Sequence, residues 1–181
     1  MSALSGFSVM SRRRALKVAL GVAGFAVAGS TGGLVALRGR APDVSNLRIL
    51  SDHEHRTLTA LAVALFPAGG AFPSGADGLD LARTFDGFLE GEPEDRQKDL
   101  QRALLLLEYG PVIFERRLRT FSNLPVDERL AHFERWLTSD RLLRRQVAVA
   151  FKKFLCIVFY DRPEVWADIG YVIAPFGAAT P

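Results

Sequence analysis

From Ser45 onward, apolar residues recur every three or four positions, and no stretch alternates polar and apolar residues as a half-buried strand would. The stripes are Leu58, Leu61, Ala62 and Leu65; Leu81, Phe85, Phe88 and Leu89; Leu100, Leu104 and Leu107; Leu130, Phe133, Trp136 and Leu137; and Leu143, Val147, Ala150, Phe151, Phe154 and Val158. This pattern predicts an all-α fold, an irregular bundle of about five or six helices that follows an N-terminal apolar leader or anchor helix.

Local signals set the expected helix ends. SDHE, at Ser51 to Glu54, fits a capping box, and Pro67 with the Gly-rich loop after it should end the helix that begins there. Gly110 and Pro111 should kink or break a later helix, because proline removes a backbone donor. Three other residues suit the start of a helix: Pro93, Pro125 and Asp140.

The N-terminal 40 residues have a different composition. SRRRALK precedes a run without charges, Val18 to Leu37, which is the layout of a translocation signal. SRRRALK resembles the twin-arginine export motif, Ser/Thr-Arg-Arg-x-Phe-Leu-Lys, with alanine in place of the phenylalanine. The matching residues are Ser11, Arg12, Arg13, Leu16 and Lys17. A signal for the general secretory route and an ordinary membrane anchor are the alternatives.

The fate of this leader is open from the sequence. Residues 26–28 have the Ala-x-Ala form of a cleavage site, whereas twenty uncharged residues are about enough to span a bilayer. We expect a periplasmic protein, which stays anchored to the inner membrane if the leader is retained. The expected organisation is a signal or anchor at 1–40, a linker at 41–50 and a helical domain at 51–181.

Charge is sorted between the leader and the body. The chain has a net charge of +3, but residues 1–40 carry six cations and no acid. The remaining residues carry 17 basic and 20 acidic side chains, so the body is mildly acidic. This excludes the basic footprint of a nucleic-acid-binding protein.

No catalytic or metal-binding motif emerges. Dinucleotide, phosphate-loop, zinc-protease and serine-hydrolase signatures are missing. His53 and His55 point about 200° apart on a helix and His132 is remote, so we interpret DHEH as a solvated helix start. Cys156 is the single cysteine, which excludes an intrachain disulfide, and its apolar neighbours predict a small core residue.

The other charged residues fit solvated surfaces. The carboxylates cluster around a helix start, at Glu90, Glu92, Glu94, Asp95 and Asp99. Two basic clusters, Arg116, Arg117 and Arg119, and Arg141, Arg144, Arg145, Lys152 and Lys153, are interpreted as amphipathic surface. An acidic partner or anionic lipid is the alternative for both clusters.

Several segments together resemble one family. They are the leader, LSDHEHRTLTALAVALFP with its Gly-rich loop, LLLLEYGPVIF, FSNLPVDERLAHFERWLTS and, most specifically, FYDRPEVWADIGY. In this order they resemble subunit 3 of membrane-bound gluconate 2-dehydrogenase and its relatives, over most of 50–171. The chain departs from the usual tail of that family after position 171, where Val172 and Ile173 replace a Gly-Tyr-Pro-Gly-Pro sequence.

The resemblance implies a small subunit that is not itself the catalyst. It implies a partner subunit of the glucose-methanol-choline type that holds FAD, and a c-type cytochrome in some complexes, with no cofactor or metal in this chain. The small subunit would supply the twin-arginine signal for a folded partner that lacks one.

The C-terminal tail is aromatic and irregular, and two interpretations stay open: it folds back on its own bundle, or it contacts a partner, since tryptophan and tyrosine are enriched at interfaces. The residues expected to make the partner contact are Tyr160, Trp166, Ile169, Gly170 and Tyr171.

Two other classes stay open. The chain could be a membrane-tethered helical adaptor for another redox partner. It could also be an exported enzyme that works alone, with a pocket lined by carboxylates and His132.

Overall fold

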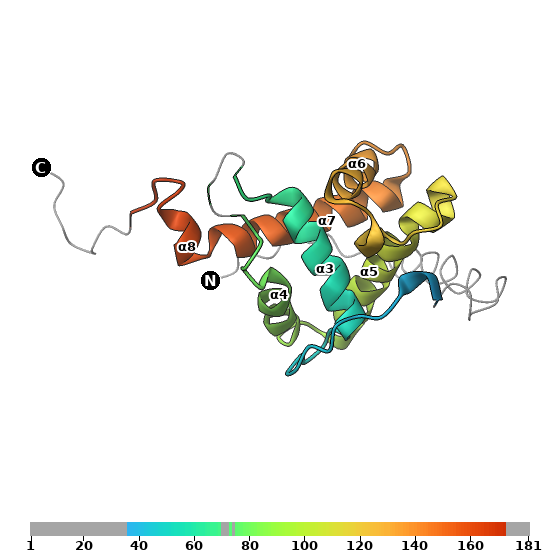
Figure 1. Cartoon of the computed structure of the whole chain (residues 1–181). Helices are drawn as coiled ribbons and strands as arrows, with labels where there is room; N and C mark the ends of the chain where they lie inside the picture. The colour runs from blue at the N-terminus through green and yellow to red at the C-terminus, as the bar shows by residue number, and fades with distance from the viewer. Residues whose placement is uncertain (1–35, 70–72, 74, 173–181) are drawn as a thin grey trace, which may run out of the picture.

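The protein is described by a computed structural model that covers residues 36–69, 73 and 75–172 (Figure 1). These residues form an all-α fold without strands. The elements are α3 (Asp52–Leu65), α4 (Leu81–Leu89), α5 (Glu94–Glu115), the 3-10 turn η1 (Phe121–Asn123), α6 (Val126–Leu137), α7 (Leu142–Tyr160) and α8 (Pro163–Trp166). The expected all-α class is therefore confirmed. Residues 1–35, which include most of the leader, its expected anchor helix and the five export residues, lie outside the described residues.

Helix α3 lies at the centre of the bundle and packs against α4, α5, η1 and α6 (Figure 1). Leu58 and Leu61 on this helix are completely buried. Large aromatic side chains fill the space around them, among them Phe85 of α4 and Phe151 of α7, whose ring centroids lie 6.4 Å apart. Burial of one such side chain contributes about 1.5–3 kcal/mol, so the apolar stripes hold the bundle together.

The local signals predicted most helix starts. The Ser51 hydroxyl accepts from the Glu54 N–H and the Glu54 carboxylate accepts from the Ser51 N–H, so the capping box is confirmed. Asp140 was expected to cap the last long helix, and that prediction is wrong. The N-cap of α7 is Arg141, without a side-chain cap, because the Ser139 hydroxyl already accepts the Arg141 N–H in the preceding turn.

Gly110 and Pro111 lie inside α5 and do not break it. The helix continues to Glu115 and ends at Arg116, which has a left-handed φ of 54° and donates its N–H to the Pro111 carbonyl. The expected break is wrong because Gly110 lets α6 approach closely. A Cβ at Gly110 would lie only 2.7 Å from Trp136 Cζ2. Tertiary packing thus outweighs the backbone hydrogen bond that Pro111 removes.

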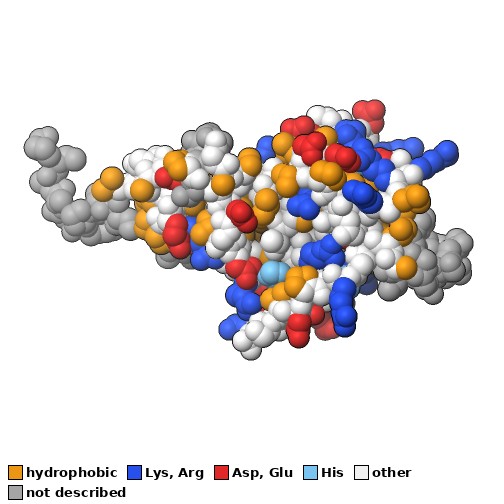
Figure 2. All heavy atoms as spheres, viewed as in Figure 1, with side chains coloured by type: hydrophobic (Ala, Val, Ile, Leu, Met, Phe, Trp, Pro, Cys, Tyr) orange, Lys and Arg blue, Asp and Glu red, His pale blue; other side chains and the backbone are white. Residues whose placement is uncertain are grey.

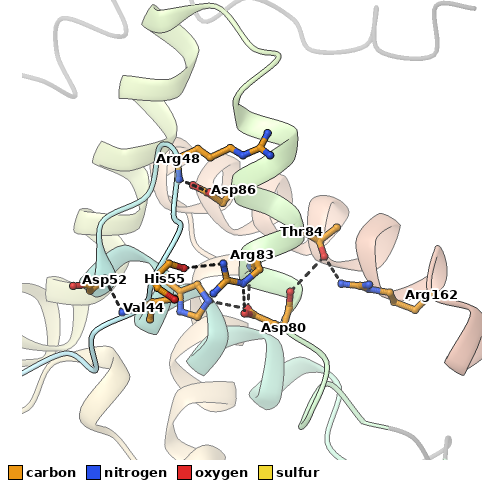
Figure 3. Close-up of polar contacts among 10 residues, drawn as sticks. Val44, Arg48, Asp52, His55, Asp80, Arg83, Thr84, Asp86 and Arg162 are labelled. Carbon is orange, nitrogen blue, oxygen red and sulfur yellow. Dashed lines mark hydrogen bonds and ion pairs between the residues drawn. The ribbon is translucent and has the colours of Figure 1, made fainter.

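The segment before α3, expected as a linker, is held against α4 by one carboxylate (Figure 3). Asp86 is 2 % exposed and accepts from the backbone N–H groups of Arg48, Ile49 and Leu50 at 2.7–2.9 Å. An ionised carboxylate accepts stronger hydrogen bonds from backbone N–H groups than a neutral side chain does. Asp86 therefore fixes the path of the chain from residue 48 into α3.

Candidate partner-binding surface

The end of α7 forms an aromatic group with the end of α3. Phe159 is completely buried and stacks on Phe66, with ring centroids 4.2 Å apart and an interplanar angle of 6°. Tyr160 meets Phe66 and Phe159 edge-on, at 6.4 and 5.4 Å. These pairs fix the position at which the chain leaves α7, so the residues that follow start from a rigid base.

Helix α8 is fastened to the bundle at its base. Val165 is completely buried, and the Arg162 guanidinium donates to the Thr84 hydroxyl of α4 (Figure 3). Trp166 Nε1 donates to the carbonyl oxygen of Tyr160 at 3.0 Å. The irregular tail that the sequence predicts thus contains one short helix, whose position is set by α4 and α7.

The chain after α8 turns back on a glycine. Gly170 has a φ of +68°, a left-handed conformation that costs other residues about 1–2 kcal/mol. Its N–H donates to the Ala167 carbonyl, and the Tyr171 N–H donates to the Trp166 carbonyl at 2.9 Å. This is the hydrogen-bond pattern of a Schellman motif, and its usual apolar contact is the edge-on pair of Trp166 and Tyr171, 5.4 Å apart.

The resulting surface is apolar and exposed. We call it the C-terminal apolar surface, and it comprises Ile157, Tyr160, Trp166, Ile169, Tyr171 and Val172. Tyr171 is 56 % exposed and Ile169 is 39 % exposed, while Trp166 is half-buried. Figure 2 shows hydrophobic side chains on the end of the molecule that bears α8. The structure therefore brings together all five residues for which the sequence predicted partner contact.

The histidines of DHEH have separate environments, and the interpretation as a solvated helix start is wrong for His55. His55 is 9 % exposed, and its Nε2 lies 2.8 Å from Asp80 Oδ1, the carboxylate that also caps α4 (Figure 3). Burial would raise the pKa of Asp80, but hydrogen bonds from Arg83 and His55 outweigh it and hold that pKa below its usual value. Within the described ranges, no three His, Cys, Asp or Glu side chains gather as metal ligands.

One carboxylate that the sequence reading assigned to the surface is in the core. Glu108 of α5 is completely buried and accepts from Ser122 N and Oγ, at 3.0 and 2.7 Å, and from Thr57 Oγ1 at 3.1 Å. The spacing could have revealed it, since Glu108 lies one turn after the buried Leu104. Its three donors connect α3, α5 and η1, which is a structural role.

His132 is also buried and forms a second polar group. Its Nδ1 lies 2.6 Å from Glu115 Oε1, and Arg135 donates to the same oxygen. Burial lowers the pKa of His132 although Glu115 opposes the shift. The pKa of Glu115 is lowered, because hydrogen bonds from Arg135 and His132 outweigh its burial. A fully buried imidazole that is hydrogen-bonded to Glu115 joins α6 to the end of α5, which is a structural role.

Three further features concern reactive groups, surface hollows and membrane-spanning helices. Cys156 is half-buried on α7, not in the core as expected, and burial raises the pKa of its thiol. A shallow hollow of about 200 Å³ has Arg38, Lys98 and Arg102 among its lining residues, and the last two form ion pairs with neighbouring acids on α5. Within the described part of the chain, no helix combines the length and the apolar character needed to cross a bilayer.

Comparisons with known proteins do not place the chain in a family. No protein-family model, no curated protein and no solved structure matches it significantly. The features of the chain that indicate a function are therefore the C-terminal apolar surface and the motifs in the sequence.

Proposed function

We propose that this chain is a non-catalytic, exported small subunit of a flavin-dependent sugar or alcohol dehydrogenase complex. It supplies the twin-arginine signal and stabilises or escorts a catalytic subunit of the glucose-methanol-choline type that holds FAD. A c-type cytochrome is the third subunit in some such complexes. The chain itself holds no cofactor in this proposal, and it works in the periplasm, on the inner membrane if its leader is retained.

The observation that carries the proposal is the C-terminal apolar surface. Tryptophan and tyrosine are enriched at the centres of protein interfaces, because they offer a large apolar area with few rotatable bonds. Here Trp166 and Tyr171 pair with each other on a turn set by Gly170, so little ordering is needed before a partner binds. A surface that is apolar, exposed and already rigid supports a binding role.

The leader supports the second half of the proposal. The twin-arginine route exports folded proteins, a property that benefits a protein whose cofactor is inserted before export. Because the cofactor is assigned to the partner, the export signal on this chain serves the complex. Arg12 and Arg13 would be read by an acidic receptor surface, and lysines would not offer the same planar fork of donors.

The direct test is a pull-down with a C-terminal tag from periplasm and membranes, comparing the wild type with Arg12→Lys/Arg13→Lys. We expect a yellow, FAD-bearing protein to co-purify with the wild type and to stay in the cytoplasm with the variant. A flavoprotein exported regardless of the variant would refute the escort role. A non-flavin redox protein in the pull-down would establish the alternative, a membrane-tethered adaptor.

The contact surface is tested separately, with variants at both of its ends. Trp166→Ala should lower co-purification of the partner more than it lowers the helicity of the subunit, because Trp166 is half-buried and lies outside the central core. Gly170→Ala should also lower co-purification of the partner, because an alanine at this left-handed position strains the turn. Gly78→Ala is the matched control: Gly78 has a φ of +88° and is equally open, but lies in the loop before α4. Collapse of helicity in Trp166→Ala would make this segment part of the core and overturn the assignment.

A further inference from the structure

Charge is also sorted along residues 36–172. Three segments, 36–40, 114–119 and 140–145, together carry eight arginines and two acids. The rest of 36–172 carries 11 basic and 18 acidic side chains. The positive charge of the described residues is therefore concentrated in three short stretches that are far apart in the sequence. We call the surface that these three segments form the basic face.

One contact joins the second and third segments, and the first segment is hydrogen-bonded to η1, the 3-10 turn that follows the second. The Arg144 guanidinium lies over the Phe114 ring, 3.7 Å from its centroid, which joins the start of α7 to the end of α5. Asn123, shortly after the second segment, donates from Nδ2 to the carbonyl oxygens of Leu37 and Arg38 at 3.1 and 3.2 Å. In Figure 2, Lys and Arg side chains lie beside hydrophobic ones at the end of the molecule where α5 ends.

The fold uses some of these eight arginines: Arg117 pairs with Glu115 and Glu128, and Arg145 donates to the Ser139 carbonyl. It leaves others without an ionic partner: among the described residues, no carboxylate forms an ion pair with Arg116, Arg119, Arg141 or Arg145. The first turn of α7 has no acid to offset Arg141, Arg144 and Arg145. Cations at this end of a helix meet the positive pole of its dipole and are unfavourable. Their placement against a local rule indicates a function outside the fold.

Exposed apolar side chains lie between the arginines. Leu118 is 81 % exposed and Leu142 is 46 % exposed, and Phe114 is at the edge of the same surface. Leu118 lies in the loop after α5, between Arg117 and Arg119. Surfaces that bind at a lipid interface combine cations, which meet the headgroups, with a few apolar side chains that reach the acyl boundary.

We propose that the basic face docks on the surface of an anionic bilayer. Its arginines would lie over lipid phosphates, and Leu118 and Leu142 would enter the interface. A lipid surface fits better than an acidic protein because of where the rest of the chain is attached. The uncharged run from Val18 ends at Leu37, in the first segment of this face. The proposal does not depend on the flavoprotein, so either proposal can fail alone.

The test measures partition of the full-length chain into vesicles by flotation. Vesicles of phosphatidylcholine alone are compared with vesicles that contain about one third phosphatidylglycerol, at low and at high salt. Any contribution of the leader is common to all variants. Arg141→Gln/Arg145→Gln removes two cations of the basic face, and Lys152→Gln/Lys153→Gln is the matched control, two exposed cations further along the same helix. Leu118→Ser tests the apolar contribution.

We expect the arginine pair to lower partition into the anionic vesicles by roughly 10- to 30-fold, at the usual strength of a cation near such a surface. The lysine pair should change it less than about threefold, and salt should remove the difference. Leu118→Ser should lower partition without changing its salt dependence. Equal loss in both pairs, or equal binding to both kinds of vesicle, would refute the proposal. So would binding of the basic face to soluble polyglutamate with no preference for anionic vesicles, which would assign it to an acidic protein.

Discussion

Gly110 is the position where a single methyl group tests the packing of α5 against α6. Glycine inside a helix normally costs about 1 kcal/mol relative to alanine, so a Gly→Ala change there should stabilise. At Gly110 the added Cβ would lie 2.7 Å from Trp136 Cζ2 and 2.8 Å from His132 Nε2. Both rings are at most 1 % exposed and have no space to retreat. Such overpacking costs about 1–3 kcal/mol, so we expect Gly110→Ala to destabilise the fold by about 1–2 kcal/mol.

Gly87 supplies a control of opposite sign. It lies in α4, is exposed, and an added Cβ would meet nothing within 4 Å. Gly87→Ala should therefore stabilise by about 0.5–1 kcal/mol. Urea unfolding of both variants, followed by circular dichroism and tryptophan fluorescence, gives the two free energies. In thermal unfolding, the midpoint should fall by roughly 4 °C for Gly110→Ala and rise by roughly 2 °C for Gly87→Ala. If Gly110→Ala stabilised as much as Gly87→Ala, the close approach of the two helices would be wrong.

Two further predictions concern the buried polar groups. Glu108→Ala should lower the free energy of unfolding by about 2–4 kcal/mol, because it leaves the Ser122 donors buried without an acceptor. Urea unfolding measures this change. The control is Glu94→Ala on the exposed start of α5, which we expect to have no measurable effect. The pKa of His132 is lower in the fold than its ordinary 6.5, so the unfolded chain binds protons first and stability falls as the pH drops below about 6.5. His132→Gln should reduce the dependence of the free energy of unfolding on pH, measured from pH 7.5 to 5.5. A smaller dependence should remain from His53, because burial also lowers its pKa. An unchanged pH dependence would contradict the role given to His132.

The predictions that succeeded depend on neighbours in the sequence. The capping box of Ser51 and Glu54 closes within four residues, and the apolar stripes have the period of a helix whatever lies opposite. Gly170 was assigned to the contact surface as part of the irregular aromatic tail, and the structure gives a physical reason for a glycine at this position, because the turn there needs a left-handed residue. All of these depend on local backbone geometry, which a single sequence encodes well.

The predictions that failed depend on distant neighbours. The spacing from Leu104 could have placed Glu108 on a buried face, but its hydrogen-bond donors could not be predicted, because Thr57 and Ser122 are 51 and 14 positions away in the sequence. The break expected at Pro111 ignored α6, whose rings hold α5 in place at Gly110. In both cases the contacts that decide the outcome are tertiary.

The two proposed surfaces are compatible because of the length of α7. The helix has 19 residues, so its ends are about 28 Å apart at the usual rise per residue. Its first turn belongs to the basic face, and its last leads into the C-terminal apolar surface (Figure 1). A bilayer at one end therefore leaves the other end free for a protein. Arg141→Gln/Arg145→Gln should release the chain from lipid without weakening its binding to the partner subunit. It should also stabilise the fold slightly, because it removes two cations from the positive pole of the α7 dipole. A loss of partner binding in that variant would show that the two ends do not act independently.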